Sequence, residues 1–393
     1  MDIQNFSALF NTPARCEAFL KLIKDNKTKH IFIQGLEGSS IALFFSNLLE
    51  HKQAHIIIAN DLDEAGYLYN DLVQINGNDH ILLFPSGYKR DIKYGQPDPP
   101  SEILRTEVLN RLCQKGESLL IVTYPEAIAE KVVPVNMLSE QTLHIDKNSK
   151  CDIITLSDKL RERGFEEVDY VYEPGQFAVR GSILDVFSYT NELPYRIDFF
   201  GKEVESIRTF EVETQLSTGK LEEVYIVANV CGQEVSGISI LDFIDKNTIL
   251  ICHNLSWVID RISTIASESL SEQTLIAEEG DRYAMQKIID VTAFQKKITT
   301  FRRIDYGASS EANAPAVIRF NCAPQGVYHK NFDLVSQSFS QFIEKGYTLY
   351  ILSDSEKQIE RLQAIFEERG DSISFTPVLK TLHEGFVDND LKI

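Results

Sequence analysis

A glycine-rich segment at residues 35–42, GLEGSSIA, follows an apolar run and precedes a helical pattern, which is the setting of a phosphate-binding loop. In the pattern G-x-x-x-x-G-K-[ST], the lysine reaches the outer phosphates of a nucleotide and the hydroxyl binds magnesium. Gly35 and Gly38 are present here, but Ser40, Ile41 and Ala42 replace the last glycine, the lysine and the hydroxyl residue. We therefore expect a degenerate loop without catalysis, with a weak anion site at the start of the helix as the open alternative.

Arginines placed among apolar side chains mark a second candidate site. Runs rich in β-branched and aromatic residues, separated by turn residues such as Pro174 and Gly175, predict a meander of antiparallel strands. These runs are 168–172, 176–180, 183–188, 195–200 and 204–208. Alternation along a strand predicts that two sets each share a face: Arg180, Ser182, Leu184 and Val186, and then Arg196, Asp198 and Phe200. Arginine beside aromatic rings is typical of protein-binding hot spots, while an ordinary half-solvated sheet is the alternative.

The runs PGQFAVRGSILDVF at 174–187 and LPYRIDFFGKEVESIRTF at 193–210 carry a family resemblance. They are similar to the second domain shared by the bacterial nucleotide-excision-repair protein UvrB and the transcription-repair coupling factors (Mfd). The resemblance continues more weakly to both ends, so the chain is interpreted as the N-terminal UvrB-homologous region of a coupling factor. In that family this domain docks UvrA. The docking residues that this implies are Arg180, Arg196 and Asp198, with Phe177 and Phe187 as apolar candidates.

The sequence departs from the family pattern at the docking domain in two places. Glu166 and Glu167 stand where the family often has an arginine, and Ala178 stands where UvrB has a further arginine. These departures predict a weaker interface or a partner of different charge.

The resemblance also bears on nucleotide chemistry. UvrB-like helicases carry an Asp-Glu pair after an apolar strand, whereas the matching run ILDFIDKNTILICHN at 240–254 ends in His253 and Asn254. Neutral side chains cannot replace two carboxylates on a divalent metal ion. The resemblance therefore implies a helicase-like fold without catalytic residues, metal or cofactor. ATP-dependent DNA translocation would belong to a separate motor in the full-length protein.

Residues 85–100 form a Pro/Gly-rich segment in which basic and aromatic side chains alternate. Lys89, Arg90 and Lys93 lie close to Tyr88 and Tyr94, a combination that could contact nucleic acid, although a plain connecting loop is the alternative. UvrB carries a long DNA-clamping hairpin at this place, and its absence here resembles the coupling factors.

Composition excludes several other classes of function. The net charge of −19 argues against a broad DNA-binding surface, because nucleic-acid affinity depends largely on lysine and arginine. The six cysteines include no C-x-x-C pair, which predicts reduced thiols. The chain shows neither a signal-peptide pattern nor an apolar run of membrane-spanning length. We expect a cytoplasmic monomer that does not enter a membrane.

Helical and strand patterns alternate at both ends of the chain, which predicts an α/β fold with a parallel sheet. The expected arrangement is a degenerate P-loop and helicase-like domain in two segments, 1–130 and 229–393, the second completing the UvrB-like module. The UvrA-docking domain, with an α+β antiparallel sheet, is inserted at 131–228. Trp257 is expected in the core, and the apolar run at Leu391 is expected to continue in a longer protein.

The function implied by the resemblance is recruitment of UvrA to stalled RNA polymerase in transcription-coupled nucleotide excision repair. RNA polymerase and DNA would be bound only by segments absent from these residues. A UvrB-like DNA-binding or weakly nucleotide-binding scaffold is the alternative function.

Overall fold

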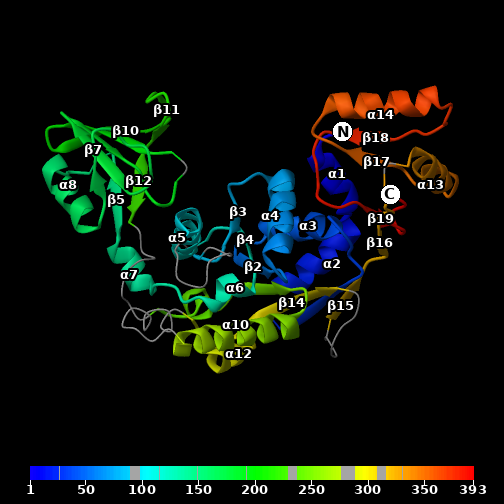
Figure 1. The fold of residues 1–393 in the computed structure, drawn as a ribbon, viewed down its shortest axis with the longest axis horizontal. Helices are drawn as coiled ribbons and strands as arrows, with labels where there is room; N and C mark the ends of the chain where they lie inside the picture. Colours follow the sequence, from blue (N-terminus) through cyan, green and yellow to red (C-terminus); the bar gives the residue numbers. More distant parts are fainter. Residues whose placement is uncertain are drawn as a thin grey trace.

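The structure is a computed structural model that describes residues 1–25, 27–88, 98–114, 116–147, 149–191, 193–228, 237–275, 288–307, 316–329 and 331–393. Figure 1 shows a central sheet with its helices, a green unit on one side and an orange and red unit on the other. Among the described residues, no helix combines the length and the apolar character needed to cross a membrane.

The central element is a parallel sheet of seven strands in the order β15-β1-β14-β13-β2-β4-β3. Its strands are β1 (His30–Gln34), β2 (Ala54–Ile58), β3 (Ile81–Leu83), β4 (Leu119–Thr123), β13 (Ile249–Cys252), β14 (Arg302–Gly307) and β15 (Ala316–Arg319). Strands from before and after the green unit, at 30–123 and 249–319, form this sheet, so the predicted parallel sheet is confirmed. β1 lies between β14 and β15, which brings the segment after β1 close to residues far away in the sequence.

Helices cover both faces of the central sheet, because its strands are apolar on both sides. They are α1 (Ile3–Phe10), α2 (Pro13–Lys24), α3 (Ser40–Phe45), α4 (Leu62–Asn76), α5 (Pro99–Cys113), α6 (Pro125–Ala129), α9 (Ile240–Phe243), α10 (Leu255–Leu275) and α12 (Val291–Ile298). α7 (Val135–Glu140) lies at the connection to the green unit, where it contacts α5 and β5 (Thr142–Asp146). α3 is short and continues as a 3-10 helix, Ser46–Glu50. In Figure 1, α10 and α12 lie on the face opposite α3 and α4.

The tryptophan prediction is wrong. Trp257 lies in the first turn of α10 and is 51% exposed. The buried residues of this helix are Val258, Ile262 and Ile265, which recur at helical spacing and define the stripe that faces the core. Trp257 lies beside that stripe and therefore on the surface.

The green unit holds a second, six-stranded sheet in the order β11-β10-β9-β8-β7-β6. Its strands are β6 (Glu166–Glu167), β7 (Gln176–Arg180), β8 (Ile183–Val186), β9 (Tyr195–Phe200), β10 (Glu203–Phe210) and β11 (Ser217–Leu221). β5 (Thr142–Asp146) pairs separately with β12 (Glu223–Val227), and α8 (Ile153–Glu162) supplies Leu156 and Leu160 to the shared core. The meander is confirmed from β7 to β11, where each neighbouring pair is antiparallel.

The prediction that the meander begins with a strand at residues 168–172 is wrong. Residues 168–172 form no strand, and the strand before β7 is the short β6, which runs parallel to β7. The apolar residues of this segment pack in a small cluster instead. Val171 is buried there with Ala178, Phe187 and Phe210, and Val168 packs against the same cluster.

The orange and red unit contains α13 (Phe332–Glu344), β17 (Tyr350–Leu352), α14 (Glu356–Glu368) and β18 (Thr376–Val378). β17 and β18 form a parallel pair, and β16 (Cys322–Pro324) pairs with β19 (Phe386–Asp388). The residues after β15 therefore build small sheets of their own and add no strand to the central sheet within the described chain.

Candidate functional site

One face of the six-stranded sheet is lined by charged side chains, and we call Arg180, Asp185, Arg196, Asp198 and Arg208 the polar face. Directly opposed residues of antiparallel strands share a face. Asp185 is opposite Arg196, and Arg196 is opposite Arg208. Arg180 and Asp198 are both opposite Ile183, which places them on the same side.

The predicted membership of this face is corrected at β8. Arg180 is opposite Ile183, so the face continues from Arg180 to Ile183 and Asp185. Leu184 and Val186 point to the other side, where both are buried against α8. The turn at Gly181 and Ser182 interrupts the alternation of side chains between β7 and β8. The residues of β8 therefore point to the opposite faces from those predicted. Gly181 adopts a left-handed conformation with φ of +64°, as a tight turn requires.

Asp185 organises the polar face. Its carboxylate is 1% exposed and accepts hydrogen bonds from Arg196 Nε at 2.7 Å and Arg196 Nη2 at 2.9 Å. Arg180 Nη2 contacts the same carboxylate. The hydrogen bond to Asp185 is the main reason why the pKa of Arg196 is raised. A buried acid between two arginines is a fixed, charge-assisted arrangement that keeps both guanidinium groups in place.

The two arginines are also packed against aromatic rings. The Arg196 guanidinium lies 4.3 Å from the centroid of Phe210 and donates to the backbone oxygen of Gln215 at 3.0 Å. The Arg180 guanidinium lies 4.9 Å from the centroid of Tyr170, whose ring is exposed. Arg180 is 35% exposed whereas Arg196 is 14% exposed, so Arg180 offers more of its guanidinium to a partner.

The remaining predicted docking residues differ in their accessibility. Asp198 accepts hydrogen bonds from Ser182 at 3.2 Å and from Arg208 at 3.4 Å on the open side of the sheet. Phe177 and Phe187 are 0% and 6% exposed, so neither ring lies on the accessible surface of this sheet. Asp185 was missed, although an acid inside the apolar run ILDVF was a signal for a buried ion pair.

The loop at residues 35–42 lies between β1 and α3 at the carboxyl edge of the central sheet. Gly35 and Gly38 have φ of +81° and +53°, which favours glycine at both positions. Ala42 is buried, and Ile41 packs against the same hydrophobic core. Ser40 Oγ accepts from the backbone N–H of Glu37 at 2.9 Å, so part of the loop is closed on itself.

The segment after β13 adjoins this loop. His253 and Asn254 follow β13, and a Cβ atom on Gly307, at the end of β14, would lie 3.3 Å from the His253 ring. The Gly35 N–H in turn donates to the Gly307 oxygen at 3.2 Å. The ring of His253 stacks on Tyr306 and bonds Asn60 through Nδ1 at 2.7 Å. The fold thus brings the two predicted segments together.

In the part of the chain that the structure describes, no group of three or more His, Cys, Asp or Glu side chains is placed to hold a metal ion. Of the basic and aromatic segment after β3, Tyr88 is described, whereas Lys89, Arg90, Lys93 and Tyr94 lie outside the described residues.

Comparison with known proteins gives two consistent similarities. Residues 143–249 match the family model of the UvrB interaction domain. The chain is also similar to the transcription-repair-coupling factor of Staphylococcus epidermidis, at 20% identity over 422 residues that cover 91% of this chain and 35% of the relative. The corresponding factor of Staphylococcus aureus is 22% identical over 400 residues, covering 86% of this chain and 34% of the relative. The chain therefore spans about a third of the length of these relatives.

Proposed function

Because the chain carries a UvrB interaction domain and is similar over most of its length to the N-terminal third of transcription-repair-coupling factors, we propose that it is a protein-interaction module that recruits UvrA. The observation that supports this proposal is the polar face, which lies within the matched residues 143–249. RNA polymerase and DNA are contacted by other segments of the longer protein in this account.

Arg180 is the centre of the proposed interface. Its guanidinium is fixed on one side by Asp185 and supported from another by Tyr170, so little side-chain freedom is lost on binding. The remaining donors suit a carboxylate of the partner, because guanidinium and carboxylate groups form paired hydrogen bonds. Exposed Tyr170 and Tyr172 extend this surface with rings that can be buried by a partner.

The proposed recruitment is tested by gel filtration of the chain mixed with UvrA of the same organism. We expect a complex that elutes ahead of either protein and contains both. Separate elution of the two proteins, even at the highest concentration at which each stays unaggregated, would mean that this module does not dock UvrA by itself.

We also propose that the two outer segments, 1–130 and 229–393, belong to one helicase-like domain that binds no nucleotide, with the docking domain inserted at 131–228. Strands of the central sheet come from both segments, which supports this division. Ile41 and Ala42 pack into the core at the positions where a phosphate-binding loop needs lysine and hydroxyl groups.

A variant that restores the lysine and the hydroxyl group of the loop tests whether the domain binds nucleotide. In Ile41→Lys with Ala42→Ser, we expect no saturable, magnesium-dependent binding of a fluorescent ATP analogue, as in the wild-type chain. The reason is that backbone oxygens of Glu384 and Gly385 lie against Gly38, where phosphates would need to enter. A titration with and without EDTA measures this, and magnesium-dependent saturation in either protein would contradict the proposal.

A further inference from the structure

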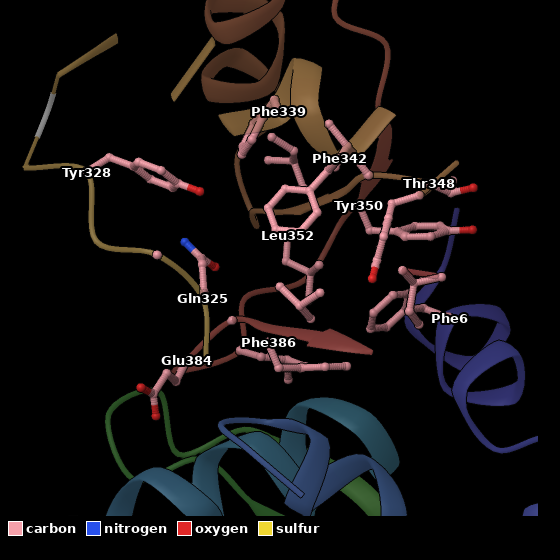
Figure 2. Close-up of a pocket in the computed structure, with 18 of the residues that line it drawn as sticks. Phe6, Gln325, Tyr328, Phe339, Phe342, Thr348, Tyr350, Leu352, Glu384 and Phe386 are labelled. Carbon is pink, nitrogen blue, oxygen red and sulfur yellow. The ribbon is translucent and has the colours of Figure 1, made fainter. Parts of the chain in front are cut away.

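A segment near the end of the described chain crosses the loop at residues 35–40, and we call residues 382–386 the strap. Figure 2 shows Glu384 at the edge of a hollow and Phe386 beneath it. The hollow measures about 390 Å³ and is lined by aromatic and aliphatic side chains that include Phe6, Tyr350, Leu352 and Phe386. The strap therefore separates the loop from an apolar space next to α13 and β17.

The strap is held by hydrogen bonds of its backbone. The Ser39 N–H donates to the Glu384 oxygen at 3.0 Å, and the Glu384 N–H donates to Ser39 Oγ at 3.0 Å. The His383 N–H donates to Asp71 Oδ1 at 2.7 Å. These bonds use backbone N–H and oxygen groups of the strap, as in recognition of a peptide through its main chain, and their partners are Ser39 of the loop and Asp71 of α4.

Asp71 connects the two parts of this contact. Its other oxygen, Oδ2, accepts from Ser39 Oγ at 2.5 Å, so one buried carboxylate fixes both the loop hydroxyl and the strap amide. Burial raises the pKa of this carboxyl, while the bonds from Ser39 and His383 act in the opposite direction. Both carboxylate oxygens therefore accept hydrogen bonds, which compensate part of the free-energy cost of burying this group.

Shape complementarity completes the contact. A Cβ atom on Gly38 would lie 2.8 Å from the Gly385 oxygen and 3.2 Å from the Glu384 oxygen, so the two backbones approach as closely as only glycine allows. The ring of His383 stacks on Tyr67 of α4 with centroids 3.4 Å apart and planes 8° apart.

We propose that the loop at residues 35–40, together with Asp71 and Tyr67, is a binding site for a peptide backbone, and that its ligand is the strap of the same chain. The Ser39 N–H, which could face a phosphate in a phosphate-binding loop, donates here to the backbone oxygen of Glu384. The site holds the unit of α13, β17, α14 and β18 against the central sheet. This inference is independent of UvrA docking, which concerns the other sheet.

Hydrogen exchange of the full chain, read by mass spectrometry at single-amide resolution, tests the proposal. In Asp71→Ala we expect the amides of His383, Glu384 and Ser39 to exchange at least about tenfold faster, with β13 unchanged, because the carboxylate that orders the contact is lost. Asn70→Ala, at an exposed neighbouring position of α4, is the matched control. Equal exchange of the strap amides in the two variants would overturn the proposal.

A second pair of variants covers the case in which Asp71→Ala also loses protection in β13. Gly38→Ala places a methyl group against the strap, whereas Gly77→Ala places one at another glycine of positive φ, +79° compared with +53° at Gly38, where the added Cβ would contact nothing within 4 Å. Faster strap exchange in Gly38→Ala alone supports the site. The same change in both variants, or in neither, would overturn it.

Discussion

Replacing Asp185 by alanine is expected to destabilise the domain that holds the six-stranded sheet by roughly 3–5 kcal/mol, the usual cost of removing one partner of a buried ion pair. The carboxylate is 1% exposed and receives both Nε and Nη2 of Arg196. Without it, Arg196 keeps the Gln215 oxygen as an acceptor but remains desolvated beneath the sheet surface. The same variant releases Arg180, so we expect UvrA binding to weaken at least about tenfold, or about 1.4 kcal/mol.

The measurement is hydrogen exchange of β8 and β9 amides across a urea series, because Trp257 lies in α10 and does not report on this domain. Asp198→Ala is the matched control, since Asp198 is 25% exposed and holds Arg208 at 3.4 Å. We expect the control to cost less than about 1 kcal/mol, as for partly exposed pairs. Similar losses in both variants would show that Asp185 has no special role in the polar face.

Replacing Arg15 by alanine is expected to have the second large effect. We expect a loss of roughly 3–5 kcal/mol in the stability of the C-terminal unit, which is the orange and red unit of Figure 1 together with β16 and β19. Asp388 is fully buried and receives Arg15 Nη1 at 2.6 Å and Nη2 at 3.1 Å. The backbone N–H groups of Asp390 and Leu391, each at 3.0 Å, would be its remaining donors. Arg15 also lies over the ring of Phe320, so packing is lost together with charge pairing.

Urea unfolding followed by exchange of the β17 and β19 amides measures this effect. Asp390→Asn serves as the control, because Asp390 is 55% exposed and its oxygen lies 3.7 Å from Arg15 Nη2. We expect little change in that variant. A loss below about 1 kcal/mol in Arg15→Ala would mean that the pair does not couple the N-terminal helices to the C-terminal unit.

Much of the fold follows from local sequence patterns. β7 and β9 have the predicted bounds because each is a short apolar and aromatic run between turn residues. The helix α10 was missed although Val258, Ile262 and Ile265 carry its period, since the polar residues between them hide the stripe. Contacts such as that between Ser39 and Glu384 join positions far apart in the sequence and leave no local signal.

The candidate docking site was predicted in part. Arg180, Arg196 and Asp198 do lie on one face, but the two phenylalanines next to them are buried. The alternation rule fails at Gly181 and Ser182, because a turn interrupts the extended backbone on which the rule depends. Asp185 could therefore be assigned to the arginines only once the strand register was known.

The central claim, that the polar face docks UvrA, is tested most directly by calorimetric titration of the chain with UvrA of the same organism. The wild-type chain is compared with Arg180→Ala and with Arg369→Ala, an arginine that is also 35% exposed and whose salt bridges to Asp333 and Asp371 lie outside the domain of the polar face. The account predicts binding that weakens at least about tenfold in Arg180→Ala and stays unchanged in Arg369→Ala. No binding by the wild-type chain, or equal weakening in both variants, would contradict it.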